Sequence, residues 1–136
     1  MSTPQCDWLL ADILRVPDVR HALVLSRDGL CIGSSPDLSQ DDADRLAAAC
    51  SGLQSLGFEV AHQLTGGGNA PRQLMVEFHG GFLFLVTAGV GAALAVATSD
   101  QVDAGLVARE MQHLIVRIGD HLTSPVRADR AGTPRP

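Results

Sequence analysis

The chain has 136 residues and a formal net charge of −5, and all ten of its basic residues are arginine. A chain of this length fits one domain with a core of its own. The absence of lysine excludes Schiff-base lysine chemistry and the lysine of a nucleotide-binding P-loop. Three arginines lie in the last ten residues beside one acid, so the body is more acidic than the whole chain and nucleic acid is not an expected partner.

Targeting and redox signals are few. The chain opens without a signal peptide and contains no apolar run near the roughly 20 residues of a membrane span. We therefore expect a cytoplasmic protein without membrane insertion. Its cysteines, Cys6, Cys31 and Cys50, form no C-x-x-C pair, which favours buried free thiols over a disulfide framework or a zinc site.

The chain begins with a predicted short helix and a β-hairpin. Apolar residues recur at helical spacing from Pro4 to Val16, and Pro17 ends the pattern. Two apolar runs, 22–25 and 30–33, then flank Asp28-Gly29, a dipeptide typical of tight hairpin turns. The first run is apolar at every position, so its strand should be covered on both faces. Asp28 and Gly29 are thus predicted to shape the turn rather than carry chemistry.

A long second helix is predicted from the capping residue Ser39 to Thr65, where a run of glycines breaks the pattern. Small side chains in its middle would let another backbone approach closely. Two alternatives stay open: the helix approaches the chain's own sheet, or it approaches a second copy across a two-fold axis. The helix length slightly favours the second copy, because so long a helix overhangs the sheet that it covers. The small residues are Ala47, Ala48, Ala49, Ser51 and Gly52.

Three more strands and a third helix are predicted in the second half. Residues 72–79 alternate as in a half-exposed edge strand, with Leu74, Val76 and Phe78 on one side and Gln73, Met75 and Glu77 on the other. Residues 82–88 and 92–97 are apolar throughout, which predicts central strands beside the first hairpin. A helix should follow from Ser99 to about His121. The remaining segment, 123–136, is rich in proline and charge and is expected to be disordered.

This order, α-β-β-α-β-β-β-α with strands joined by hairpins, predicts an α/β fold of the α+β type. A five-stranded antiparallel sheet would form the middle of three α/β/α layers, with one long helix on one face and two shorter helices on the other. The predicted domain spans residues 4–122.

No local motif indicates catalysis, a cofactor or a metal. Gly89-Val-Gly91 follows a strand, but Leu94 stands where a dinucleotide motif needs its third glycine, and a strand follows instead of a helix. Glu110-x-x-His113 is half of a di-iron pair, and the chain lacks the rest. The other histidines have no zinc-binding spacing. We expect no cofactor, no metal and no enzymatic activity.

Four stretches resemble the roadblock / dynein light chain family, in the bacterial branch that serves small Ras-like GTPases. They are Val19–Leu30, Leu46–Leu53, the strand pair around Gly81–Phe84, and Asp103–Met111. They are especially similar to roadblock proteins of actinobacterial conservons, operon-encoded sets that also comprise a sensor-kinase-like protein and a GTPase. The resemblance covers about residues 7–122 and implies a profilin-like roadblock fold.

The resemblance also implies a non-enzymatic homodimer. Its edge strand, at about 72–79, would pair with the two-fold mate, and the long helices would lie side by side. The implied interface residues are Ala47, Ala48, Ser51, Gly52, Gln73, Met75 and Glu77.

Implied partners are a small Ras-like GTPase, whose nucleotide cycle or localisation the protein would modulate in a signalling complex, and a sensor-kinase-like protein of the same operon. An arginine finger from Arg109 or Arg117 is chemically conceivable, but solubilising charge on a helix face is the favoured interpretation. The alternative function is a small-molecule-binding or sensory domain without a GTPase partner.

Overall fold

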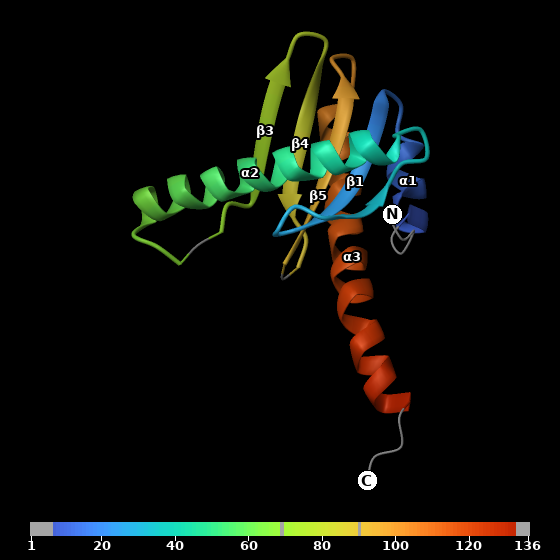
Figure 1. Ribbon diagram of the computed structural model, residues 1–136. Helices are drawn as coiled ribbons and strands as arrows, with labels where there is room; N and C mark the ends of the chain where they lie inside the picture. Colours follow the sequence, from blue (N-terminus) through green and yellow to red (C-terminus); the bar gives the residue numbers. More distant parts are fainter. Residues whose placement is uncertain (1–6, 69, 90, 133–136) are drawn as a thin grey trace.

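The computed structural model describes residues 7–68, 70–89 and 91–132. Figure 1 shows one antiparallel sheet between two helical layers, and the strand order is β2-β1-β5-β4-β3. The predicted three-layer fold is therefore confirmed, with the first hairpin beside the central strands and β3 at an edge. The elements are η1 (Asp7–Leu10), α1 (Ala11–Leu14), β1 (Val19–Ser26), β2 (Cys31–Ser34), α2 (Gln40–Thr65), β3 (Gln73–Phe78), β4 (Gly81–Thr87), β5 (Ala92–Ser99) and α3 (Ala104–Gly132).

The central strands are buried on both faces because they are apolar at successive positions. In β1, Ala22 and Val24 belong to the core under α1 and α3, whereas Leu23 and Leu25 belong to the core under α2. All four side chains are at most 1% exposed. Successive strand residues point to opposite faces, so the continuous apolar run in the sequence is what requires helices on both sides of the sheet.

The turn between β1 and β2 has the expected geometry. Gly29 has a φ of +89°, a conformation that strains residues with a Cβ atom. Its N–H donates to the Ser26 carbonyl at 3.0 Å, and the Ser26 hydroxyl donates to the Asp28 carboxylate. Asp28 and Gly29 therefore shape the turn as predicted.

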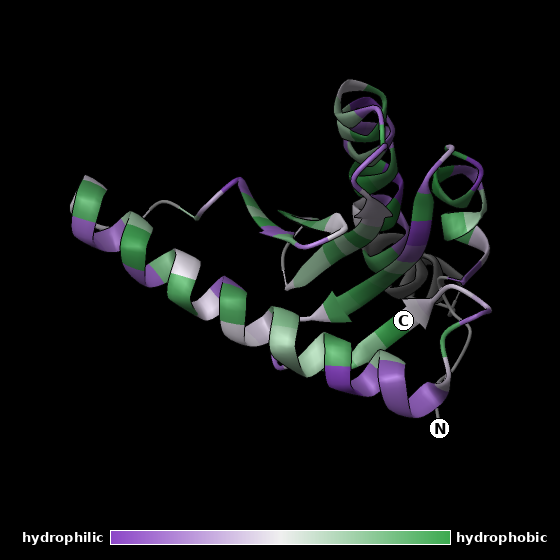
Figure 2. Ribbon diagram, turned by 90° about the horizontal axis from the view of Figure 1, so that it is seen from above, coloured by the Kyte–Doolittle hydropathy of each residue, from purple (hydrophilic) through white to green (hydrophobic). Residues whose placement is uncertain are grey.

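Helix α2 crosses the strands and continues past the edge of the sheet. It begins at Ser39, whose hydroxyl accepts from the Asp42 N–H at 3.1 Å, and ends at Gly66 with a φ of +85°. Its 26 residues extend about 39 Å, while five strands are about 24 Å wide. About ten residues must therefore overhang, and Figures 1 and 2 show the C-terminal part of α2 projecting beyond β3.

The first helix differs from the prediction. The described part is a 3₁₀ turn followed by a single α-helical turn that ends at Leu14. Asp18, with a φ of +73°, turns the chain into β1 directly after Pro17. The predicted start at Pro4 lies outside the described residues.

The third helix is longer than predicted. Helix α3 has 29 residues and continues to Gly132, so the predicted end near His121 is wrong, and α3 is not shorter than α2. The expectation of disorder rested on the proline and charge content of residues 123–136, whereas alanine and arginine, which dominate residues 127–131, are among the strongest helix formers. The helix thus enters the segment expected to be disordered.

Candidate protein-interaction surface

An open sheet edge and an overhanging helix lie next to each other in this fold. We call them the edge-and-overhang surface and define it as strand β3 together with Leu56, Val60 and Leu64 of α2. Within the part of the chain that the structure describes, strand β3 pairs with β4 and with no other strand, so its other side presents unpaired N–H and C=O groups. Such a row is a ready template for another strand.

The side chains of β3 alternate as predicted. Leu74 and Val76 pack toward α2, whereas Met75 lies opposite Phe84 on the other face of the sheet. Helix α3 packs on β4 and β5, and Met75 remains 55% exposed. Phe78 departs from the pattern, because it ends the strand and is 50% exposed. The prediction of a half-exposed edge strand is confirmed.

The overhang carries an exposed apolar stripe. Leu56, Val60 and Leu64 lie four residues apart, and their exposed fractions are 66%, 56% and 81%. Figure 2 shows hydrophobic residues along this end of the helix. Val60 and Leu64 keep the apolar helical spacing of the earlier residues, but the helix has already left the sheet where they occur. The sequence did contain a signal for this exposure, because apolar residues recur at helical spacing over a helix longer than the sheet is wide.

The small side chains in the middle of α2 are explained mainly by contacts within the chain. Ala47 is fully buried against the chain's own sheet, so we leave it out of any interface. A Cβ atom on Gly29 would lie 3.5 Å from the Ala48 Cα atom and 3.4 Å from the Ser51 Cβ atom. The Ser51 hydroxyl also donates to the Arg27 carbonyl at 2.7 Å. The hairpin turn therefore packs directly on α2 beside Ala48 and Ser51.

The predicted interface residues do not form one patch. Ala48 and Ser51 contact the β1–β2 turn, whereas Gln73, Met75 and Glu77 lie on β3, at the opposite edge of the sheet. Gly52 is exposed, and nothing lies within 4 Å of the position of a Cβ atom there. Contact of these six residues with a second copy stays a prediction, and the structure adds the overhang to the candidate surface.

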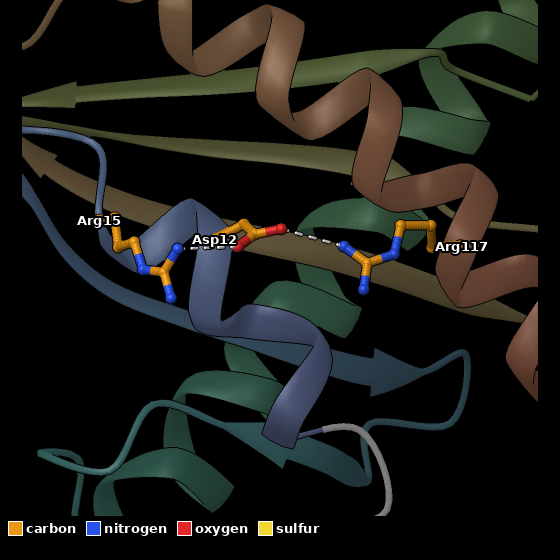
Figure 3. A network of polar contacts seen from close by, with 3 residues as sticks. All are labelled: Asp12, Arg15 and Arg117. Atoms are coloured by element: carbon orange, nitrogen blue, oxygen red, sulfur yellow. Dashed lines mark hydrogen bonds and ion pairs between the residues drawn. The ribbon is translucent and has the colours of Figure 1, made fainter.

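The charged groups of the opposite layer have a structural role. The carboxylate of Asp12 in α1 lies 3.5 Å from the Arg15 guanidinium and 3.3 Å from that of Arg117 in α3. Figure 3 shows Asp12 between the two arginines. Because all three side chains are substantially exposed, this network contributes at most about 1 kcal/mol per pair. Arg117 thus joins two helices, which supports the structural interpretation of its charge.

Three of the surface cavities lined by described residues have volumes of about 440 to 550 Å³. The largest lies between α3 and the start of β3 and is lined by Arg72, Gln73, Gln112 and Ile115 among others. All three cavities open to solvent. Within the same part of the chain, no three histidine, cysteine or acidic side chains are grouped as metal ligands, and no helix is long and apolar enough to span a membrane.

The two described cysteines are free thiols in different environments. Cys50 in α2 is fully buried, and burial raises its pKa from 9.0 to about 11. Cys31 in β2 is partly buried, and burial also raises the pKa of its thiol. A raised pKa lowers the fraction of reactive thiolate at neutral pH, so neither environment activates a nucleophile.

Comparisons with known proteins agree with this geometry. The family model "Roadblock/LC7 domain" matches residues 7–98. The crystal structure of a Roadblock/LC7 domain from Streptomyces avermitilis is 38% identical, with a TM-score of 0.80, and the match covers 85% of this chain and 96% of that one. No protein among the curated sequences matches significantly.

More distant structures share the fold alone. MglB from Myxococcus xanthus is 21% identical with a TM-score of 0.70, over 91% of this chain and 93% of that one. Profilin IA from Acanthamoeba castellanii is 13% identical with a TM-score of 0.53, over 82% and 94% of the two chains. The family match, the strand order and the Streptomyces relative agree, and this chain belongs to the Roadblock/LC7 family.

Proposed function

We propose that this chain is a homodimeric, non-catalytic adaptor that binds a small Ras-like GTPase and modulates its nucleotide cycle or its location in a signalling complex. The observation that carries the proposal is the edge-and-overhang surface. A second copy, related by a two-fold axis, would pair its own β3 with this one and cover the apolar stripe of α2. One contact would thereby satisfy the open edge and bury the exposed side chains.

The GTPase as partner is supported by the family to which the chain belongs, and the resemblance to conservon roadblock proteins supports a GTPase encoded nearby. A sensor-kinase-like protein of the same operon is a further proposed partner. An open sheet edge and an exposed apolar stripe fit a regulatory adaptor that works by protein contacts. The three cavities described above open to solvent, which does not favour the alternative of a small-molecule sensor.

Two valines make a matched test of the dimer. Val60 in the stripe and Val116 on α3 are 56% and 62% exposed. Burying a valine stabilises an interface by about 1.5–3 kcal/mol, and a two-fold interface contains each side chain twice. Because Val60 is already partly covered in the monomer, Val60→Asp should raise the dimer Kd at least about tenfold, whereas Val116→Asp should not change it. Sedimentation velocity over a concentration series measures both, and equal effects of the two substitutions would contradict the proposed interface.

The GTPase interaction needs a separate experiment. The small Ras-like GTPase encoded in the same gene neighbourhood is loaded with GDP or with a non-hydrolysable GTP analogue, and its binding to this protein is measured by calorimetry. We expect association that depends on the nucleotide state. Absence of binding in both states would refute the GTPase partner while leaving the dimer intact.

A further inference from the structure

A buried polar chain joins α2 to the sheet at the place where the helix leaves it. The side chain of Gln54 is only 5% exposed, and its Nε2 donates to the Thr87 hydroxyl at 3.2 Å. That hydroxyl in turn donates to the Pro71 carbonyl at 3.2 Å. Thr87 ends β4 and Pro71 lies two residues before β3, so one amide connects the helix, the neighbouring strand and the backbone that leads into the edge strand.

One helical turn further along α2, Gly57 brings the helix into close contact with β3 and with the backbone that leads into it. A Cβ atom on Gly57 would lie 3.1 Å from each δ-methyl group of Leu74 and 3.2 Å from the Pro71 Cγ atom. Distances this short require the neighbours to shift, so a glycine allows α2 to lie closer to β3 than another residue would. Gln54 and Gly57 together determine where the helix axis passes over the edge strand.

We infer that Gln54 and Gly57 are positioning residues that hold the overhang and strand β3 as one rigid surface for self-association. This inference rests on the proposed dimer. Strand pairing and burial of the stripe must form together when a two-fold mate binds, so the helix and the strand need a fixed relative position beforehand. A surface that is already ordered loses less conformational entropy on binding.

The polar character of this contact is what makes it specific. Apolar contacts have no preferred direction, so a helix held by them alone can slide along a sheet. Hydrogen bonds require short distances and near-linear geometry, and a buried amide without a partner is costly. Gln54 is a polar residue among the buried positions Ala43, Ala47 and Cys50 of α2, which otherwise hold the helix by apolar packing.

Substitutions along the polar chain test the inference. Gln54→Leu removes the amide but keeps an apolar side chain, and Thr87→Val removes the hydroxyl. Each should raise the dimer Kd about tenfold, which corresponds to ~1.4 kcal/mol. Because both act on the same chain of hydrogen bonds, the double variant should be no worse than either single variant. Thr87→Ser keeps the hydroxyl and should retain the wild-type Kd.

A matched control separates positioning from general stability. Ser35 is another buried polar residue, 1% exposed, and its hydroxyl accepts from the Ala22 N–H at 3.2 Å, away from β3. Ser35→Ala should lower the melting temperature without raising the dimer Kd. If Gln54→Leu also lowers the melting temperature and leaves the Kd unchanged, Gln54 is only a stability residue and the inference is wrong.

Hydrogen exchange distinguishes this inference from the proposed dimer. In the Val60→Asp background, where the chain should be monomeric, Gln54→Leu is expected to speed amide exchange in residues 55–64 of α2 and in residues 73–78 of β3 together. Faster exchange in α2 alone would overturn the coupling even if the wild type dimerises. A wild type that sediments as a monomer at every concentration would instead refute the dimer, and exchange would still decide whether the two segments form one rigid unit.

Discussion

The buried thiol of Cys50 gives a direct measure of how tightly α2 packs on the sheet. Burial raises its pKa from 9.0 to about 11, so the folded state retains a proton that the unfolded state releases. When folding raises the pKa of a group, the free energy of unfolding does not change with pH below the pKa of the unfolded state. It falls as the pH rises from that pKa toward and through the pKa of the folded state. We expect the free energy of unfolding to be level up to about pH 9 and then to fall by about 2 kcal/mol at pH 11.

The composition makes this alkaline titration unusually clean. The chain has no lysine and no tyrosine, the two residue types that normally dominate protonation between pH 9 and 11, and arginine side chains in proteins stay charged there. Urea unfolding followed by circular dichroism, at fixed protein concentration and under reducing conditions, would be compared for the wild type and Cys50→Ala. The variant should be less stable at pH 8 by about 1 kcal/mol, because a small cavity forms.

The outcome is judged from the slope of the free energy of unfolding against pH, compared between the wild type and Cys50→Ala. The other cysteines contribute equally to both proteins. Between pH 9 and 11 the wild type should lose about 2 kcal/mol more than the variant, whose own loss comes from the raised pKa of Cys31. Parallel pH profiles for the two proteins would show that Cys50 does not keep its proton in the folded state, and the tight packing of α2 on the sheet would be refuted.

Three further substitutions have effects that follow from particular contacts. Gly81→Ala should prevent folding or lower the melting temperature strongly, because a Cβ atom there would collide with the Thr98 carbonyl oxygen; a melting temperature within a few degrees of wild type would show that β4 and β5 can separate. Ser39→Ala removes the cap of α2 and should reduce the free energy of unfolding by about 1 kcal/mol, as measured by urea denaturation, whereas Ser39→Asp should retain it. Asp12→Ala breaks both exposed ion pairs, including the one to Arg117, and should cost at most about 2 kcal/mol, about 1 kcal/mol for each pair, and less still in 1 M salt; a larger loss independent of salt would contradict an electrostatic origin.

Periodicity made the fold readable because the signals along this chain are strong and agree with one another. Continuous apolar runs predicted strands covered on both faces, and Asp28-Gly29 located the first turn at the right residues. The cap at Ser39 and the glycine at position 66 marked both ends of α2. Alternation in residues 73–77 identified the edge strand. Each of these features depends on the local backbone geometry, which is set by residues that are close together in the sequence.

The interface was harder to predict because exposure depends on where distant elements lie. The same helical period that buries Ala47 also places Val60 and Leu64 in solvent, once the helix has passed the last strand. Small residues in a helix suggest that another segment approaches closely, but they do not show which segment this is. At Ala48 and Ser51 it is the turn between β1 and β2. The chain Gln54–Thr87–Pro71 joins residues more than 15 positions apart and leaves no local motif.

The open edge of β3 also bears on how a roadblock domain avoids pairing with a related domain instead of with a second copy of itself. Main-chain hydrogen bonds between two edge strands depend little on the amino-acid sequence. The backbone of β3 could therefore pair with the edge strand of any related domain in the same cell. In the proposed dimer, discrimination would then come from the side chains of the overhanging helix and of β3. Paralogues with similar strands would remain separate, or form mixed pairs, according to the size and spacing of the residues that correspond to Leu56, Val60 and Leu64.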